Sequence, residues 1–319
     1  MCRVLPGYRY NFRVKLIHAA NELGNGRRPV CLAIGVFDGV HLGHQQIIRQ
    51  TISDARQHDA LALVVTFDCH PNTVVAPAHV PPQIFARPQK LRAIEALGAN
   101  ALLEIHFDRA FSEKPAAVFI RELARDLGTI HSVCVGADFV FGHHRSGNAT
   151  LLKQLGEESH FHVHGLAAVS LDGQPVSSTR IREMIRAGNF DAASQMLGRP
   201  YAISGRVVEG DRIGRQLGFP TANLDVTSLI LPPNGVYSAV TTFHDRFYRA
   251  ALNIGVRPTV AAAPQLRVEA HLLDFSGQLY GEELELQIAA KIRDERRFHS
   301  RAELGAQIAG DVAAVREAK

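Results

Sequence analysis

The stretch Gly35-Val36-Phe37-Asp38-Gly39-Val40-His41-Leu42-Gly43-His44 determines how the N-terminal part of the chain is expected to fold. A short apolar run at residues 30–34 precedes it and residues 44–56 have helical character, so the glycines fall at a strand-to-helix turn. Backbone N–H groups at a helix start lack intrahelical partners and lie at the positive end of the helix dipole. The turn is therefore predicted to bind nucleotide phosphates.

Two histidines add side-chain donors to this turn. His41 and His44 are three residues apart and are expected to share one helix face, with Gly43 letting a ligand approach the backbone. Phosphoryl and nucleotidyl transfer depend on charge stabilisation and positioning more than on a covalent nucleophile, which suits imidazole donors. Without the histidines, a glycine-rich turn of this kind is common in parallel α/β folds and would be weak evidence.

Strand-like and helix-like segments alternate through the N-terminal part of the chain. This alternation is typical of βαβ units and predicts an α/β domain with a doubly wound parallel sheet, in which ligands bind at the carboxyl ends of the strands. The expected strands are residues 30–34, 61–67, 101–107, 131–135 and 161–169, and the expected helices are 44–56, 88–97, 115–127, 150–157, 179–186 and 189–197.

The pattern changes near residue 200. From Tyr201 to about Asp294 the sequence reads as short strands separated by glycine and proline turns, and one helix is expected at residues 301–317. Closely spaced strands with few helices indicate a small antiparallel barrel or sandwich, and of the two we expect a β-barrel with a terminal helix. We therefore predict two unlike domains, residues 1–198 and 199–319.

Composition fits such a protein. The 319 residues suffice for two cores, and 46% are hydrophobic. Neither a membrane-spanning segment nor a signal-peptide core is expected, which predicts a cytoplasmic protein with no membrane partner. The four cysteines have no paired spacing, which argues against a disulfide framework. The net charge of +4 is dispersed, so small anionic substrates are favoured over nucleic acid. The oligomeric state is left open.

A second glycine-rich stretch, residues 205–223, opens the predicted barrel. Its glycines would let the backbone wrap phosphates, although glycines beside barrel strands also serve hairpins and bulges. Pro220 stiffens the approach to Thr221 and Asn223, whose oxygens suit a magnesium ion that bridges nucleotide phosphates. The glycines are Gly205, Gly210, Gly214 and Gly218.

Residues 266–275 alternate as a strand does. Val268, Ala270 and Leu272 form one face, and Glu269 lies on the other with Arg267 and His271. A carboxylate there would take the proton from a substrate hydroxyl that attacks a γ-phosphate. The alternative is a glutamate that only faces solvent.

In these motifs the chain resembles the prokaryotic bifunctional riboflavin kinase and FAD synthetase (FMN adenylyltransferase) family over nearly its whole length. Two sets of motifs, in order and in different domains, carry the resemblance. The first set is residues 35–44, 66–71, 135–142 and 176–182, and the second is residues 205–223, 233–237, 253–259, 268–275, 279–281 and 292–295.

The resemblance implies two activities on small-molecule substrates. The second domain would phosphorylate riboflavin with ATP to give FMN, with Glu269 as base and Thr221 and Asn223 at Mg²⁺. The first, a nucleotidyltransferase-like domain, would join FMN to the AMP part of ATP, releasing pyrophosphate and giving FAD, with His41 and His44 at the α-phosphorus. Further nucleotide-binding residues would be Gly35, Phe37, Asp38, Gly39, Gly43, Asp138, Ser177, Ser178, Thr179 and Arg182, with Gly205, Gly210, Gly214, Gly218 and Pro220 in the barrel; flavin-binding residues would be Phe67, His70, Pro71, Asn253 and Arg293.

Two places depart from the family pattern. Cys69 stands where a proline is usual, and residues 143–148 replace a lysine- and glycine-rich loop. The departures leave open a monofunctional riboflavin kinase with an impaired adenylyltransferase domain. A non-catalytic flavin-binding protein is a third hypothesis, which the intact set His41, His44, Thr221, Asn223 and Glu269 disfavours.

Overall fold

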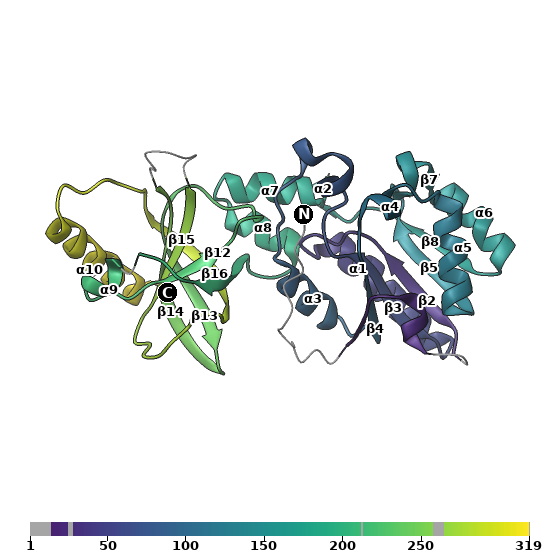
Figure 1. Cartoon of the computed structure of the whole chain (residues 1–319), viewed down its shortest axis with the longest axis horizontal. Coiled ribbons are helices and arrows are strands. Elements are labelled where there is room, and N and C mark those ends of the chain that lie inside the picture. Colours follow the sequence, from purple (N-terminus) through teal and green to yellow (C-terminus); the bar gives the residue numbers. More distant parts are fainter. Residues whose placement is uncertain (1–13, 25–27, 212, 258–264, 319) are drawn as a thin grey trace. The chain divides into compact units, whose positions relative to one another are not determined.

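The computed structural model describes residues 14–24, 28–211, 213–257 and 265–318. By its contacts the chain forms two compact units, Met1–Pro81 with Arg87–Ser177, and Pro82–Ala86 with Ser178–Lys319 (Figure 1). The helices α7 (Ser178–Arg186) and α8 (Phe190–Leu197) belong by their contacts to the second unit. The domain limits 1–198 and 199–319 stay a prediction. In the described ranges, no helix combines the length and the apolar character that a bilayer span requires.

The first unit contains a six-stranded sheet in which every strand pairs in parallel with its neighbours. This confirms the predicted parallel α/β sheet. Five of its strands were predicted, whereas β1 has only three residues and gives no readable periodicity. In spatial order the strands are β1 (Lys15–Ile17), β4 (Ala101–Ile105), β3 (Leu61–Phe67), β2 (Val30–Ile34), β5 (Ile130–Gly136) and β8 (His162–Leu166).

Helices cover both faces of this sheet. Leu32 and Val133 share a buried cluster with side chains of α5 (Ala116–Leu127) and α6 (Ala149–Ser159), which lie side by side in Figure 1. On the opposite face, Asp54 of α1 (Leu42–Gln57) accepts a hydrogen bond from Ser132 Oγ of β5 at 2.8 Å. The alternation of side chains along each strand thus supplies both faces, as a doubly wound fold requires.

The strand order reverses between β2 and β5, which are neighbours in the sheet although β3 and β4 come between them in the chain. Ligands in open α/β sheets bind outside the carboxyl ends of the strands at such a point. The turn between β2 and α1 leaves β2 at this end, which positions the first candidate site.

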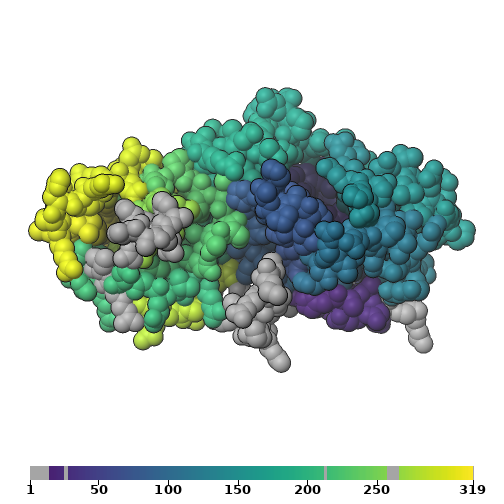
Figure 2. Space-filling view, turned by 45° about the horizontal axis from the view of Figure 1, so that its top comes forward, coloured from purple at the N-terminus to yellow at the C-terminus, as the bar shows by residue number. Residues whose placement is uncertain are grey.

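The second unit is built on a closed antiparallel barrel, as predicted. The terminal helix α10 (Arg301–Glu317) packs against β13, β14 and β16 and forms the yellow surface in Figure 2. The strands are, in barrel order, β11 (Ala202–Val208), β12 (Ala222–Asp225), β15 (Gln265–Leu272), β14 (Arg246–Arg257), β13 (Gly235–Phe243) and β16 (Glu283–Arg293).

A short segment from the N-terminal part of the chain completes the second unit. Gln83 N donates to Ser228 O at 2.8 Å, and Ile230 N donates to Gln83 O at 2.7 Å. Ile84 and Phe85 are buried. Pro82–Ala86 is therefore part of the second unit, which the sequence pattern did not reveal.

Alanine substitutions at two glycines of the second unit should have opposite effects on stability. A Cβ at Gly205 in β11 would lie 2.6 Å from the backbone oxygen of Asp225, whereas a Cβ at Gly305 in α10 would meet nothing within 4 Å. We expect Gly205→Ala to lower the free energy of unfolding by about 1–3 kcal/mol through overpacking. Gly305→Ala should raise it by up to about 1 kcal/mol. Urea unfolding followed by tyrosine fluorescence measures both, and equal midpoints would contradict this account of the barrel.

Candidate active sites

The turn between β2 and α1 has an unusual backbone. Phe37, Gly39 and Val40 have positive φ values of 51°, 79° and 39°. Such values are rare for non-glycine residues, above all for a β-branched one, and persist only where the surroundings enforce them. Gln45 Nε2 from α1 donates to Val40 O at 2.9 Å. The turn is thus held in a strained shape at the end of the sheet where ligands bind.

Phe37 lies beneath this turn. Its side chain is only 1% exposed, and a Cβ on Gly35 would approach its ring to 2.9 Å. The ring also meets the imidazole of His44 edge to face, with centroids 5.3 Å apart. Gly35 and Phe37 therefore shape the turn from below, and their predicted contact with a nucleotide stays a prediction. Asp38 is also buried.

The structure brings His41 and His44 together as a stacked pair, with ring centroids 3.6 Å apart. His41 caps the N-terminus of α1, where its Nδ1 accepts a hydrogen bond from His44 N at 3.4 Å. A Cβ at Gly43 would lie 3.3 Å from the His41 ring, so glycine leaves room for this stacking. His44 Nδ1 is buried without a hydrogen-bond partner among the described residues, a polar atom that a ligand would satisfy.

The environment of His44 disfavours its charged form. Burial, together with the nearby charges of His41 and Lys90, lowers the pKa of His44 well below its ordinary value. His44 is therefore neutral at pH 7. An anionic phosphate beside it would favour the protonated form, so ligand binding and proton uptake are coupled at this site.

The remaining residues that were predicted to bind the nucleotide fall in both units. Asp138 is exposed after β5 and Ser177 is half-buried, both in the first unit. Ser178, Thr179 and Arg182 belong to α7 in the second unit, where Arg182 Nε donates to Pro82 O at 2.7 Å. Their convergence on one ligand stays a prediction.

The predicted flavin loop accommodates Cys69 without loss of hydrogen bonding. The buried thiol donates to Phe107 O at 3.6 Å and accepts from Thr73 Oγ1 at 3.1 Å. Phe67 ends β3 with its ring 5.4 Å from that of Phe107, and His70 Nδ1 accepts from Asn72 N at 3.1 Å. Pro71 precedes α2 (Asn72–Val75). This departure from the family pattern therefore leaves an ordered loop.

The second departure, residues 143–148, forms the loop and the second strand of a small hairpin. Its strands are β6 (Val140–Phe141) and β7 (Gly147–Asn148), and Asn148 caps α6 by accepting from Leu151 N at 3.0 Å. A Cβ at Gly147 would lie 2.7 Å from Ala116 Cβ. The replacement loop is thus packed onto α5.

In the barrel, the strand registers align the predicted kinase residues in one row. Asn223 of β12 is directly opposite Glu269 of β15, and Glu269 is directly opposite Asn253 of β14. The row continues through Val236 to Arg293 of β16. Directly paired residues point to the same face, so four strands bring these polar groups together.

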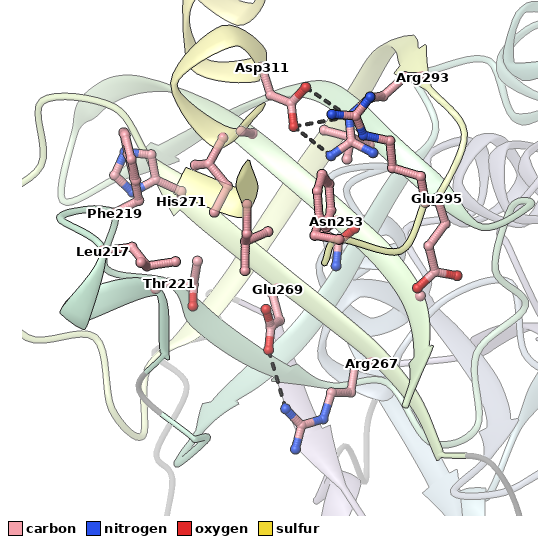
Figure 3. Close-up of a pocket in the computed structure, with 18 of the residues that line it drawn as sticks. Leu217, Phe219, Thr221, Asn253, Arg267, Glu269, His271, Arg293, Glu295 and Asp311 are labelled. Carbon is pink, nitrogen blue, oxygen red and sulfur yellow. Dashed lines mark hydrogen bonds and ion pairs between the residues drawn. The ribbon is translucent and has the colours of Figure 1, made fainter. Parts of the chain in front are cut away.

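A cavity of about 340 Å³ lies over this row. Thr221, Asn253 and Glu269 line it, and residues of α10 form another of its walls. In Figure 3 Thr221 and Glu269 face a common space, with Phe219 and His271 at one end. Glu269 is therefore part of a cavity wall and not a glutamate that only faces solvent.

Close packing explains most of the glycines before Thr221. A Cβ at Gly210 would overlap the carboxamide of Asn223, and one at Gly214 would lie 2.4 Å from Phe219 O. Gly218 has a left-handed φ of 86°. Gly205 lies inside β11, and a side chain there would collide with the neighbouring strand, so barrel packing alone accounts for this glycine. Arg212 in this stretch and residues 258 and 259 of the motif at 253–259 lie outside the described residues.

Two neighbours of Glu269 have roles that sequence reasoning did not assign. Arg267 Nη1 lies 2.8 Å from Asp211 Oδ2 and 3.5 Å from Glu269 Oε1 (Figure 3). His271 Nδ1 lies 2.9 Å from Pro220 O and so must carry the proton there, which fixes the backbone just before Thr221. The alternation of β15 was the available signal, since it places Arg267 and His271 on the face of Glu269.

Arg293 connects the barrel to α10. Its Nε and Nη2 donate to the buried carboxylate of Asp311 at 2.9 and 2.7 Å, and Gln307 Nε2 donates to the same group at 2.7 Å (Figure 3). Arg293 was predicted to bind flavin. It lines the cavity, but these two donor groups hold the helix that closes it, so its flavin contact stays a prediction.

Thr221 and Glu269 offer a hydroxyl and a carboxylate in the cavity wall, and Asn223, which is paired directly with Glu269 but does not line the cavity, offers a carboxamide. Mg²⁺ prefers such oxygen ligands and commonly combines a few of them with substrate phosphates. The close contact of Asn223 with Gly210 holds the carboxamide beside the glycine-rich stretch. The residues therefore fit a magnesium ion that arrives with a nucleotide.

The Arg293–Asp311 pair should be important for stability. Asp311→Ala leaves a mostly buried guanidinium without its carboxylate, so we expect the free energy of unfolding to fall by about 3 kcal/mol. The matched control is Asp294→Ala, which removes an exposed carboxylate paired with Lys291 and should leave the urea midpoint unchanged. Loss of equal stability in both variants would contradict the anchoring role of Asp311.

The pKa values of His106 and His44 should be shifted in opposite directions from that of an ordinary histidine. The hydrogen bond that His106 donates to the carboxylate of Asp68 raises the pKa of His106, whereas burial lowers that of His44. His44 therefore favours folding above its unfolded pKa of about 6.5 and loses this contribution as pH falls. The contribution of His106 to folding stability is present below the unfolded pKa and is lost as pH rises through the folded pKa of His106. NMR titration should show His106 protonating first; the reverse order would contradict the assigned environments.

Comparison with known proteins covers both units. Residues 25–180 match the family model described as FAD synthetase, and residues 197–319 match that described as riboflavin kinase. The bifunctional riboflavin kinase/FMN adenylyltransferase of Escherichia coli K12 is 37% identical over 95% of this chain and 97% of its own, and that of Haemophilus influenzae is 34% identical over 94% and 96%. A crystal structure described as a macrolide-efflux protein from Streptococcus pneumoniae has a TM-score of 0.79 at 28% identity, covering 95% of this chain and 99% of its own; we take from it the likeness of fold. The chain belongs to the bifunctional riboflavin kinase/FMN adenylyltransferase family.

Proposed function

We propose that this protein converts riboflavin to FMN in its second unit and FMN to FAD in its first. The observation that carries the proposal is that each unit has its own phosphate-directed groups: the stacked His41–His44 pair in one, and the cavity with Thr221 and Glu269 in the other. The family matches cover the same two parts of the chain.

In the kinase step, Glu269 accepts the proton of the riboflavin 5′-hydroxyl as its oxygen attacks the γ-phosphorus of ATP. The new O–P bond forms as the bond to the ADP oxygen breaks, giving FMN and ADP. The guanidinium of Arg267 lies 3.5 Å from Oε1 of Glu269 and helps to orient the carboxylate. Asn253, directly opposite Glu269, is suited to orient the flavin chain.

Thr221 and Asn223 would hold Mg²⁺ with the nucleotide phosphates. A magnesium ion bound there would neutralise charge that develops on the phosphate oxygens. The hydrogen bond of His271 to Pro220 positions Thr221 for this contact. Gly210 and Gly214 let the backbone pass close to Asn223 and Thr221.

In the adenylyl transfer, a phosphate oxygen of FMN attacks the α-phosphorus of ATP, and the bond to pyrophosphate breaks. The FMN phosphate is already ionised, so no general base is required. His41 and His44 donate hydrogen bonds to the α-phosphate, where charge builds up in the transition state. We place both reactions in the cytoplasm, where ATP is supplied.

A monofunctional riboflavin kinase is the second candidate, suggested by Cys69 and residues 143–148. Both regions are packed and hydrogen-bonded, and neither disturbs the stacked histidines. The first unit also matches the FAD synthetase model. The bifunctional enzyme is therefore favoured.

Two substitutions separate the reactions. Glu269→Gln keeps the shape of the side chain but removes the base, so FMN formation should fall by about 10²–10⁴-fold. His44→Ala removes a donor to the α-phosphate and should lower FAD formation by about 10²–10³-fold. Chromatography after incubation with Mg²⁺ and ATP, using riboflavin or FMN as the flavin, measures each step.

Each variant should keep the other activity, which is its internal control, and Glu317→Gln on the exposed end of α10 should keep both. If wild-type protein stops at FMN, the monofunctional candidate is correct. Loss of both reactions in a folded single variant would contradict the two-site proposal.

A further inference from the structure

Lys90 is a buried cation at the edge of the first unit's sheet where ligands are expected. It belongs to α3 (Arg87–Glu95) and is only 9% exposed. Its ammonium donates to Phe67 O at 2.7 Å, and Phe67 is the last residue of β3. The charge of Lys90 is therefore fixed at the carboxyl end of a central strand.

A chain of hydrogen bonds joins Lys90 to the strained turn. Lys90 Nζ donates a hydrogen bond to Thr66 Oγ1 at 3.4 Å. The Thr66 hydroxyl in turn donates to Val36 O at 3.1 Å. Val36 lies in the turn that leads to His41 and His44, so Lys90 braces the backbone that presents both imidazoles.

Lys90 lies among several charged side chains. The neighbouring buried carboxylate, Glu104 of β4, is already held by Arg87, whose Nε lies 2.8 and 3.0 Å from its two oxygens. Burial lowers the pKa of Lys90, while Glu104, Asp38 and Asp68 raise it and Arg87 lowers it. Burying an ammonium costs several kcal/mol, and a well-packed apolar side chain avoids that cost. A role for the charge itself is indicated.

We propose that Lys90 is a positioning residue for adenylyl transfer, which braces the turn through Thr66 and holds a buried positive charge at the carboxyl end of β3. The proposal rests on the proposed function of the first unit. Because the charge of Lys90 helps to keep His44 neutral, the two side chains do not repel each other before ATP binds. When the triphosphate enters, the turn is already shaped and the cation is already in place, as electrostatic preorganisation requires.

Lys90→Met tests this role because it removes the charge and both hydrogen bonds while keeping a long, unbranched side chain. We expect kcat for FAD formation from FMN to fall about 10- to 100-fold. Riboflavin phosphorylation in the same protein should be unchanged. The NMR titration of His44 should move upward in pH, towards that of an ordinary histidine.

Two further variants give the matched comparison. Lys90→Arg keeps the charge and should retain a low pKa for His44 and most of the FAD-forming activity. Lys153→Met removes an exposed lysine of the first unit and should behave as wild type. A purely structural lysine would lower the thermal midpoint of Lys90→Met without changing kcat for FAD formation.

A folded Lys90→Met protein with wild-type kcat and an unchanged His44 titration would overturn the proposal. If Lys90→Met does not fold, Thr66→Val decides, since it breaks the same hydrogen-bond chain with an isosteric side chain. Reduced kcat in Thr66→Val supports the brace, and wild-type kcat refutes it. Wild-type protein that makes no FAD from FMN would instead refute the proposed function of the first unit.

Discussion

The direct cross-strand pairing of Glu269 with Asn223 on one side and Asn253 on the other is the constraint on which the barrel site depends. A slip of one residue in β15 would turn Glu269 into the barrel interior and expose Val268 and Ala270. The apolar face of β15 is almost fully buried, so the hydrophobic effect fixes the register. The same burial that stabilises the barrel thus places the carboxylate opposite the amides.

Local patterns made much of this predictable. The alternation of residues 266–275 gave the correct face for Glu269, and the run at 30–34 followed by the glycine turn gave β2 and α1. Period-2 and helical patterns depend on near neighbours in the chain, which is why they can be read directly. The helix begins at Leu42, slightly before the predicted residue 44, because the side chain of His41 caps it.

Residues whose roles depend on distant partners were not predictable in this way. Asp311 pairs with Arg293 only because α10 folds back onto the barrel. Lys90 reaches Phe67 O only because α3 brings it to the end of β3. Pro82–Ala86 joins the second unit through hydrogen bonds to residues 228 and 230. The burial of Phe37 was likewise not predictable, because its ring packs against Gly35 in the folded turn.

The central claim is that the two phosphate-transfer sites are separate and that FMN links them. Mixing the Glu269→Gln and His44→Ala proteins in one reaction with riboflavin, ATP and Mg²⁺ tests it most directly. Neither protein alone should accumulate FAD. The mixture should form FAD, because FMN released by the His44→Ala protein is a substrate for the intact first unit of the other. A mixture that forms no more FAD than either protein alone would contradict the account.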